Sequence, residues 1–383
     1  MGTLRFGLIG TGYMGRAHAI ALHAVAAVFP EIDAPGCELL ADMNAERAGT
    51  AAREMGFRRS TGDWREVVAD PAIDVIDICT PNHLHREMAL AAIAAGKHVY
   101  CEKPLAHTAS EAREIAAAAR AAQVHHVIGF NYICNPVIRM ARDIIASGEL
   151  GDITAFHGEY HEDYMSDPAA PYSWRCQRRL AGAGALADLG SHLINMAHFL
   201  IGDIARVSAA LHTVHTRRID TATGEHRLVE NEDVAQALLE FASGTTGTIA
   251  ISRIATGRKC GLAWRIFGTR GSLAFDQERM NELQQYSAGD PAGRRGFRVI
   301  LAGPEHPDYG YFCPAPGHGL GINDLKIIEV RNMIRGIVSD TPAYPDFEEG
   351  LRVQQVMDAI QRSHAARGWV DVQDAERESG SWS

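Results

Sequence analysis

Glycines 10, 12 and 15 form a GxGxxG pattern in the segment GTGYMG. The pattern lies between an apolar run (4–9) and an alanine-rich helical stretch, an order typical of strand, glycine turn and helix. In that setting Gly10 permits the tight turn, Gly12 lets the backbone approach a pyrophosphate, and Gly15 allows close helix packing, with the helix N-terminus facing the phosphates. The segment therefore predicts dinucleotide binding.

Asp188 and His192 are four residues apart, which places both side chains on one face if a helix begins at Gly190. Histidine changes protonation near neutral pH, so His192 could serve as a general base, while Asp188 orients it or binds a substrate hydroxyl. The structural alternative is a core histidine preceded by a helix-capping aspartate.

Lys103 follows the apolar run 97–101, at the carboxyl end of a predicted strand, where doubly wound sheets place their ligands. Its ammonium could donate a hydrogen bond to an oxygen of a ligand bound at that edge. A solvated surface lysine is the alternative.

Asp42 ends the second predicted strand, in ELLADMN, and is the candidate for binding the ribose hydroxyls of a dinucleotide. It lies further from the glycines than the usual spacing, which is explained if 28–37 extends the first helix and its following loop. The alternative is an aspartate that caps the next helix.

Alternating strands and helices must position these residues. After the first strand, apolar runs at 38–41, 73–79, 97–101 and 126–130 alternate with helical patterns near 44–55, 83–95 and 109–122. Strands that are apolar throughout indicate a parallel sheet covered on both faces. We therefore predict an α/β fold that begins with a Rossmann-type doubly wound parallel sheet in residues 1–129.

The pattern changes after residue 130. Long amphipathic β segments follow at 154–164, 205–216, 233–252 and 263–275. They are typical of an antiparallel sheet with one face covered by helices. Residues 130–383 are accordingly predicted to form an α+β domain with a large, mostly antiparallel open sheet.

Composition narrows the classes of function. The 383 residues carry a formal charge of −10, with no long run of either sign and no apolar run of membrane-spanning length. Nucleic acid and membranes are therefore not expected as partners, and a cytoplasmic location is expected. Seven scattered cysteines favour reduced buried thiols over disulfides. Eighteen histidines include close pairs but no recognisable third ligand, so no metal is expected.

Three further segments, taken with the glycine turn, resemble the Gfo/Idh/MocA family, the group of glucose-fructose oxidoreductase and inositol dehydrogenase. They are TPNHLH (80–85), CEKPL (101–105) and AGAGALADLGSHLINMAHFLIG (181–202). SDPAAPYSWRCQ and GTRGSLAFDQERMNELQ are similar to the branch that includes levoglucosan dehydrogenase and some inositol dehydrogenases. Asn195 replaces a common aspartate and Tyr132 a common arginine, which leaves the substrate contacts open.

The resemblance implies an NAD-dependent dehydrogenase that oxidises a secondary hydroxyl of a cyclic polyol or pyranose sugar, such as levoglucosan, an inositol or a related aldose. Lys103, Asp188 and His192 match the family's catalytic positions. The expected NAD contacts are Gly10, Gly12, Tyr13, Met14, Gly15, Asp42, Thr80, Pro81, Asn82, His85, Glu102 and Lys103. The expected substrate contacts are Lys103, Asn131, Tyr160, Arg175, Asp188, His192 and His318.

The family resemblance also implies a homotetramer or homodimer, paired through the open face of the C-terminal sheet. Two other activities occur within the family and remain open. One is an NAD-dependent glycosidase that passes through a transient keto sugar, and the other is a non-catalytic regulator that binds NAD or a sugar.

Overall fold

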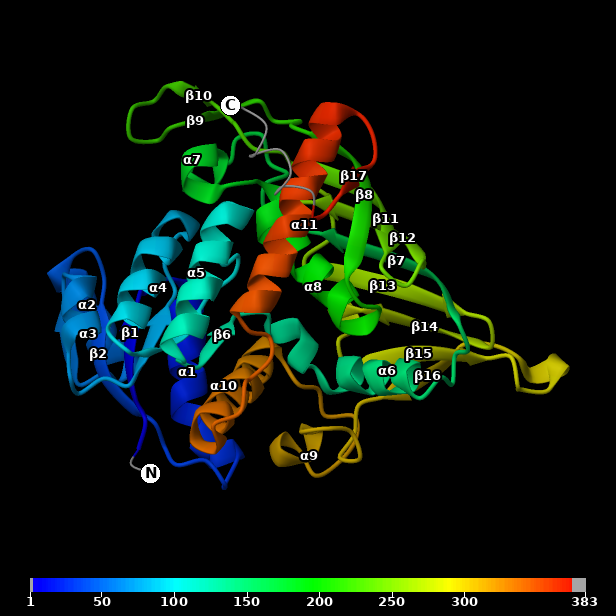
Figure 1. Cartoon of the computed structure of the whole chain (residues 1–383), viewed down its shortest axis with the longest axis horizontal. Helices are drawn as coiled ribbons and strands as arrows, with labels where there is room; N and C mark the ends of the chain where they lie inside the picture. The colour runs from blue at the N-terminus through cyan, green and yellow to red at the C-terminus, as the bar shows by residue number, and fades with distance from the viewer. Residues whose placement is uncertain (1–2, 374–383) are drawn as a thin grey trace. The chain divides into compact units, whose positions relative to one another are not determined.

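The chain folds into two compact units (Figure 1), and the computed structural model describes residues 3–373. Unit 1 comprises Met1–Cys134 and Leu320–Leu351, and unit 2 comprises Asn135–Gly319 and Arg352–Ser383. The expected boundary between 129 and 130 lies near the first crossing from one unit to the other. The structure differs in that the chain returns to unit 1 at Leu320, so neither unit is a single stretch of sequence.

Unit 1 is built on a six-stranded parallel sheet in the order β3-β2-β1-β4-β5-β6. Buried residues dominate β1, β2, β4 and β5, as expected for strands covered on both faces. The strands are β1 (Arg5–Ile9), β2 (Gly36–Ala41), β3 (Arg59–Thr61), β4 (Val75–Ile78), β5 (His98–Cys101) and β6 (His126–Ile128). The helices are α1 (Tyr13–Val28), α2 (Ala45–Met55), α3 (Trp64–Ala69), α4 (His85–Ala94), α5 (Ala109–Ala122), α10 (Ile322–Ser339) and the first turn of α11 (Phe347–Ala366).

The strand order of unit 1 reverses between β1 and β4. In open α/β sheets, ligands bind beyond the carboxyl ends of the strands at such a reversal. The glycine turn follows β1, Asp42 follows β2, Thr80 follows β4 and Lys103 follows β5. The predicted Rossmann-type sheet is confirmed, and its topology brings these loops to one edge.

Helix α10 joins unit 1 from the C-terminal part of the chain and packs along α1. Its 18 residues are covered on most sides, with eleven buried positions that include Lys326 and Glu329. A helix that buries charged residues needs polar partners inside the unit. For Lys326 and Glu329 those partners come from β5 and the residue directly after it, as described below.

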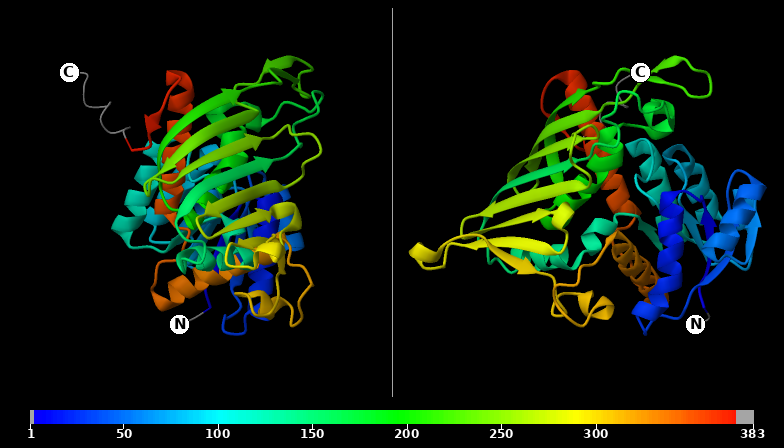
Figure 2. Two further views of the ribbon diagram at one scale, coloured as in Figure 1. Left: turned by 90° about the vertical axis from the view of Figure 1, so that its right-hand side faces the viewer. Right: turned by 180° about the vertical axis from the view of Figure 1, so that it is seen from behind.

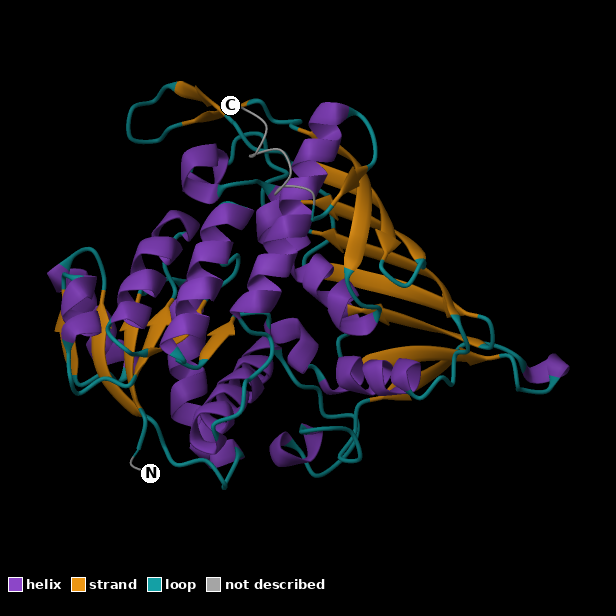
Figure 3. Cartoon of the chain, viewed as in Figure 1, coloured by secondary structure: helices purple, strands orange, loops and turns teal. Residues whose placement is uncertain are grey.

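Unit 2 contains a nine-stranded sheet in the order β16-β15-β14-β13-β7-β12-β11-β8-β17. Figures 2 and 3 show this sheet as a broad, twisted layer. Only β7 and β12 pair in parallel among its described strands, so the predicted mostly antiparallel sheet is confirmed. The strands are β7 (Ile153–His161), β8 (Ile204–His212), β11 (Val234–Phe241), β12 (Thr246–Ser252), β13 (Gly261–Gly268), β14 (Gly271–Asp276), β15 (Glu282–Ser287), β16 (Arg298–Leu301) and β17 (Val370–Asp371), beside a separate hairpin of β9 (Arg217–Ile219) and β10 (His226–Leu228).

The helices of unit 2 include α8, which packs against β7. Along β11, buried residues alternate with more exposed ones, which is the pattern of a sheet covered on one face. The helices that lie wholly in unit 2 are α6 (Pro136–Ala146), α7 (Arg178–Ala181), α8 (Ser191–Leu200) and α9 (Tyr309–Phe312); α11 continues from unit 1 into unit 2.

The seven cysteines are all described and all free, in agreement with the prediction of reduced thiols. Within residues 3–373, no helix is both long enough and apolar enough to cross a membrane.

Candidate active site

The glycine turn of unit 1 has room for a phosphate group beside Gly12. Gly10 has a φ of +106°, and a Cβ there would lie 2.4 Å from the carbonyl oxygen of Cys79. A Cβ on Gly15 would lie 2.1 Å from the carbonyl oxygen of Gly10, whereas a Cβ on Gly12 would meet no atom within 4 Å. Two glycines therefore allow close packing, and the third leaves open space at the N-terminus of α1, which fits a dinucleotide pyrophosphate. Tyr13 begins α1 and is exposed.

Asp42 is held in place by the turn that follows β1. Its Oδ2 accepts hydrogen bonds from the backbone N–H of Thr11, at 3.2 Å, and from the Thr11 hydroxyl, and its Oδ1 accepts from the N–H of Met43 at 2.9 Å. Asn44, not Asp42, caps α2, with its side chain accepting from the N–H of Arg47. The helix-cap interpretation of Asp42 is therefore wrong, and its carboxylate lies at the end of β2 beside the glycine turn.

Arg47 also lies beside Asp42, although the sequence analysis does not predict it as a site residue. Its Nε lies 3.5 Å from Oδ2 of Asp42 and donates a hydrogen bond of 3.1 Å to the Thr11 hydroxyl. Arg47 and Thr11 also line a cavity of about 600 Å³ with Arg16, Met43, Asn44, Glu46, Thr50, Ala51 and Glu54. The five-residue spacing between Asp42 and Arg47 was the available signal, because the first turn of a helix after β2 points back toward the strand end.

His85 ties together the loops that follow β4 and β5. Its ring is fully buried, with Nδ1 2.8 Å from the carbonyl oxygen of Pro104 and Nε2 2.9 Å from that of Thr80. Burial lowers the pKa of His85, against the effect of the two carbonyls. Because both ring nitrogens face backbone oxygens, the histidine positions the segments that carry Thr80–Asn82 and Lys103.

Glu102 and Lys103 lie directly after β5. Glu102 is 4% exposed, and its Oε2 accepts a hydrogen bond of 3.1 Å from the backbone N–H of Lys103. Lys103 is partly exposed, so its side chain is not buried in the core. Asn131, in a 3₁₀ turn after β6 of the same unit, is 3% exposed. A lysine anchored through its backbone, with a side chain that is not fully buried, suits a hydrogen-bond donor to a ligand.

In unit 2, Asp188 lies in a five-residue π-helical turn, Leu186–Gly190, which runs straight into α8. His192 lies in the first turn of α8 and is 7% exposed. Helical backbone therefore runs without a break from Asp188 to His192, but it begins as a π-helical turn at Leu186, four residues before the expected start at Gly190. π-helical turns of this kind occur often at functional sites.

Tyr164 and Arg175 both approach the carboxylate of Asp188. The Tyr164 hydroxyl donates a hydrogen bond of 2.6 Å to Oδ2 of Asp188, and Nε of Arg175 lies 3.7 Å from the same oxygen. The guanidinium of Arg175 also lies over the ring of Trp174. Tyr164 was not among the predicted site residues, because nothing in its local sequence links it to a residue 24 positions away.

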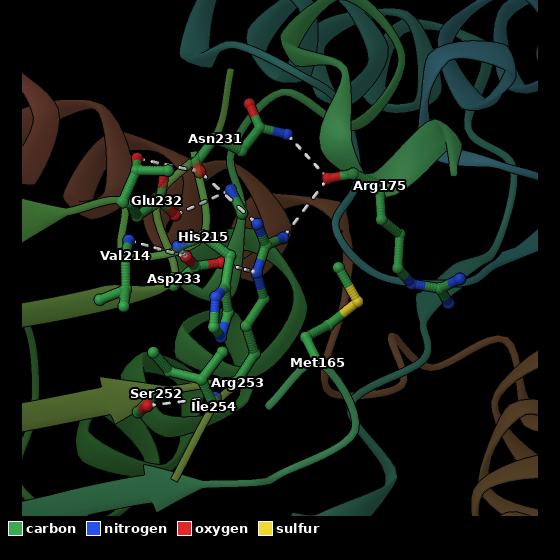
Figure 4. A network of polar contacts seen from close by, with 12 residues as sticks. Met165, Arg175, Val214, His215, Asn231, Glu232, Asp233, Ser252, Arg253 and Ile254 are labelled. Carbon is green, nitrogen blue, oxygen red and sulfur yellow. Dashed lines mark hydrogen bonds and ion pairs between the residues drawn. The ribbon is translucent and has the colours of Figure 1, made fainter. Parts of the chain in front are cut away.

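A buried ion pair fixes the loop that carries Arg175. Nε of Arg253 lies 2.9 Å from Oδ1 of Asp233, and both side chains are at most 1% exposed. Figure 4 shows the backbone carbonyl of Arg175 turned toward this network, where it accepts hydrogen bonds from Asn231 and Arg253, while the Arg175 side chain extends away. The side chain is therefore presented from a fixed backbone.

The remaining predicted substrate contacts of unit 2 lie in different surroundings. Tyr160, on β7, is 2% exposed, and its ring centroid lies 6.2 Å from that of His192. His318 is exposed in the loop between α9 and α10. Asn195 is 1% exposed on α8, one turn after His192. Tyr160 and Asn195 thus accompany His192 in the interior, whereas His318 lies on the surface of its unit.

One cluster among the described residues has metal-ligand types within reach of one another: His18, Asp77 and Cys79, in unit 1. Both ring nitrogens of His18 already face carboxylates, at 2.8 Å from Asp77 and 2.9 Å from Glu102. Burial lowers the pKa of His18, but the attraction to Asp77 and the two hydrogen bonds outweigh it and raise the pKa to about 9. Both ring nitrogens of His18 are therefore engaged by carboxylates, and the contacts in this cluster are those of a buried ion pair.

The parallel sheet with a glycine turn at its reversal point defines unit 1 as a dinucleotide-binding domain of the Rossmann type. Residues 4–130 match the model of an oxidoreductase family with an NAD-binding Rossmann fold, and residues 138–274 match the GFO/IDH/MocA C-terminal domain. The chain belongs to the Gfo/Idh/MocA family of NAD-binding oxidoreductases.

Relatives match along almost the full length. Levoglucosan dehydrogenase of Pseudarthrobacter phenanthrenivorans is 40% identical over 97% of this chain and 99% of its own. A structure of levoglucosan dehydrogenase in complex with NADH and levoglucosan has a TM-score of 0.95, with 97% and 100% of the two chains covered. An NAD-binding oxidoreductase from Klebsiella pneumoniae is 45% identical, with a TM-score of 0.93 over 97% and 99%. An inositol dehydrogenase homolog from Azotobacter vinelandii, in complex with NAD⁺, is 25% identical, with a TM-score of 0.82 over 96% and 97%.

Proposed function

We propose that this protein is an NAD-dependent dehydrogenase that oxidises a secondary hydroxyl of a cyclic polyol or pyranose sugar, with levoglucosan and inositols as the first candidates. The likeness to levoglucosan dehydrogenase over 97% of the chain carries the proposal. The glycine turn with open space at Gly12 and the anchored carboxylate of Asp42 support the cofactor. The carboxylate of Asp188, held by Tyr164 and Arg175, supports a hydroxylated substrate.

In this proposal Lys103, Asp188 and His192 carry the proton and polarisation steps. His192 accepts the proton of the substrate hydroxyl, and Lys103 donates a hydrogen bond to the oxygen as it becomes an alkoxide and then a ketone oxygen. Asp188 accepts a hydrogen bond from His192 or from a neighbouring substrate hydroxyl. NAD⁺, when bound, takes the hydride that leaves the carbinol carbon, so the products are ketone, NADH and a proton.

The proposal assigns the cofactor to the edge of unit 1 that carries the glycine turn, Asp42, Thr80–Asn82 and Lys103. It assigns the sugar to side chains that include Asn131, Arg175, Asp188 and His192, with Tyr160 and His318 as further contacts. Following the family resemblance, two or four copies of the chain pair through the open face of the nine-stranded sheet. The free, largely buried thiols suit the reducing cytoplasm as the compartment.

The test is a panel of inositols, levoglucosan and common aldoses incubated with NAD⁺, with NADH measured by its absorbance and ketone product counted. We expect NADH and ketone to accumulate in equal amounts with at least one cyclic polyol. Product formation from a glycoside without stoichiometric NADH would favour the glycosidase, in which the cofactor is regenerated in each cycle. An absence of turnover across the panel, with NADH still bound, would favour the non-catalytic regulator.

A further inference from the structure

Lys326 is one of four lysines in the chain, with Lys97, Lys103 and Lys259, and its side chain is fully buried. Lysine is almost never fully buried unless it is paired. Its Nζ lies 2.6 Å from Oε1 of Glu102 and 2.8 Å from Oε2 of Glu329, and donates to the Tyr100 hydroxyl at 3.3 Å. Helix α10 thus places the Lys326 ammonium beside Glu102, the residue directly before Lys103.

Glu102 is the centre of this buried cluster. Its Oε1 is approached by two cations, Lys326 at 2.6 Å and Nε2 of His18 at 2.9 Å, while its Oε2 accepts the backbone N–H of Lys103 at 3.1 Å. Burial raises the pKa of Glu102, but Lys326 and His18 outweigh it and hold the pKa well below its ordinary value. Oε1 of Glu102 is therefore held by the two cations, and its Oε2 binds the backbone N–H of Lys103.

The backbone of Gly129 makes room for this carboxylate. A Cβ on Gly129 would lie 2.7 Å from Oε1 of Glu102 and 3.1 Å from its Oε2. Gly129 has an ordinary negative-φ backbone, so the requirement for glycine here comes from the carboxylate and not from the turn. The carboxylate is consequently packed directly against the backbone of Gly129, as well as against the two cations.

Stability alone does not account for the cluster. Taking charges out of water is costly, and replacing a buried ion cluster by apolar side chains of similar volume is often neutral or stabilising. What the charges add is one defined orientation for Glu102. The Lys103 backbone takes its position from that orientation.

We propose that Lys326 is a positioning residue for Lys103: acting through Glu102, the buried cation on α10 sets the backbone position from which Lys103 reaches its ligand. This inference rests on the proposed function in assigning Lys103 a role in oxidation of the alcohol. The proposal adds Lys326, more than 200 positions from Lys103 in the sequence, to the residues that determine kcat.

The alternative is a purely structural role, in which Lys326 only stabilises the packing of α10 against the rest of unit 1. Lys326→Met and Ile328→Ala separate the two roles. Ile328 is fully buried on the same helix and brings no polar group, so its truncation also weakens the packing of α10. We expect both variants to unfold at lower temperature. Only Lys326→Met should lower kcat, by roughly tenfold or more, since small misplacements of a reacting group cost up to about 10²-fold.

The affinity for NADH, followed by its fluorescence, should change less than about twofold in both variants. Glu102→Gln and the double variant Glu102→Gln/Lys326→Met complete a cycle. If Lys326 acts through Glu102, the double variant turns over no more slowly than Glu102→Gln. Additive losses, or an equal loss of kcat in Ile328→Ala, would overturn the proposal.

Two measurements keep the proposal testable if Lys326→Met does not fold or if the catalytic assignment of Lys103 fails. Gly129→Ala places a methyl group against the Glu102 carboxylate and should lower kcat similarly; unchanged turnover would count against the proposal. Reductive ¹³C-methylation gives few lysine NMR signals in this chain, and Lys103→Arg assigns the signal of Lys103. That signal should shift in Lys326→Met and Gly129→Ala but not in Ile328→Ala, whatever the substrate is; an unshifted signal would refute the positioning role. If Lys103→Ala retained full turnover, the proposed function alone would have failed.

Discussion

The hydroxyl of Tyr164 donates a hydrogen bond of 2.6 Å to the same oxygen of Asp188 that Nε of Arg175 approaches to 3.7 Å. The hydroxyl and the guanidinium come from separate positions in the long connection between β7 and α8. Their convergence on one oxygen orients the carboxylate before any ligand is present. Preorganised polar groups of this kind cost little reorganisation when a substrate binds.

Tyr164→Phe removes the hydroxyl that donates to Asp188 and retains the aromatic ring. We expect kcat/KM for the best polyol to fall roughly tenfold, since a hydrogen bond to a charged group contributes about 1.5 to 3 kcal/mol. The affinity for NADH should not change. Tyr286→Phe, on β15, is a matched control that should leave both quantities as they are; an unaltered kcat/KM in Tyr164→Phe would exclude a role for this hydroxyl in orienting Asp188.

Lys103→Ala and His192→Ala should each lower kcat by about 10² to 10⁴, the usual span for positioned acid and base groups. NADH affinity, measured by fluorescence, should change little in either variant. If His192→Ala kept full turnover while losing folded protein, the core-histidine interpretation would be correct instead.

NAD should be preferred over NADP by at least roughly tenfold in kcat/KM, which requires about 1.4 kcal/mol. The reason is the carboxylate of Asp42, which can accept bonds from ribose hydroxyls but repels a 2′-phosphate. Arg47, 3.5 Å from Asp42 and 59% exposed, offsets only part of that repulsion.

The two residues should therefore act in opposite directions on cofactor choice. Asp42→Ser should reduce the preference for NAD, because Arg47 remains to meet a 2′-phosphate, and Arg47→Ala should increase it. Equal efficiency with both cofactors in the unaltered enzyme would contradict the assignment of Asp42.

Cyclic polyols should be oxidised far better than cyclohexanol. A site built to bind hydroxyls rejects an analogue that lacks them by up to about 10⁴ to 10⁵, because its buried polar groups are left unpaired. Arg175→Ala should change the ranking among polyols more than it changes NADH binding. Steady-state kinetics on the same panel checks both statements, and efficient oxidation of cyclohexanol would rule out this kind of pocket.

His18 makes stability depend on pH in a defined window. Its pKa is about 9 in the folded protein, against an ordinary value of 6.5, so the folded state binds the proton more tightly. The resulting stabilisation is fully present below pH 6.5 and is lost as the pH rises through 9. The difference corresponds to on the order of 3 kcal/mol in the free energy of unfolding.

Urea unfolding between pH 6.5 and 9 measures this loss, and His18→Gln should flatten the dependence. Other groups act mainly near or beyond the ends of the window. Cys37, Cys79 and Cys101, whose pKa values burial raises, begin to contribute near its upper end, where unfolded thiols start to ionise, and His18→Gln separates their effect from that of His18. Histidines whose pKa burial lowers act below pH 6.5; they are His85, His98, His126 and His161. A flat profile in the unaltered protein would contradict a protonated His18.

Local signals in the sequence were enough for much of unit 1. The glycine turn lies where a strand ends and α1 begins, and Thr108 caps α5 at its predicted start. In unit 2, the sequence pattern predicts one β segment at 233–252 and another at 263–275. In the structure each of these segments is a hairpin of two strands. The turn signals were present: Gly244 has a φ of +85°, and Gly268 and Gly271 flank the second turn.

Contacts between distant segments could not be read in this way. Lys326 meets Glu102 across more than 200 residues. Tyr164 meets Asp188 in a region where buried Arg218 and Arg253 bind the carbonyl oxygens of Met165 and Arg175. Such pairs depend on the path of loops in space, which periodicity and turn signals do not specify. Arg47 is nearer in sequence. It lies five residues after Asp42, in the first turn of α2, and that position could have predicted the contact.

The return of the chain to unit 1 at Leu320 sets an order of events during synthesis. By the time Cys134 is made, the sheet of unit 1 is complete, yet Lys326, the cation that neutralises Glu102, is still to be translated. At ordinary rates of translation, the intervening 135–319 takes on the order of ten seconds or more. During that interval the nascent nucleotide-binding sheet leaves uncovered the face of α1 that α10 packs against, and Glu102 lacks one of its two cations. Ribosome-associated chaperones would therefore meet this protein in an unfinished state, and a fragment that stops before α10 would stay in it.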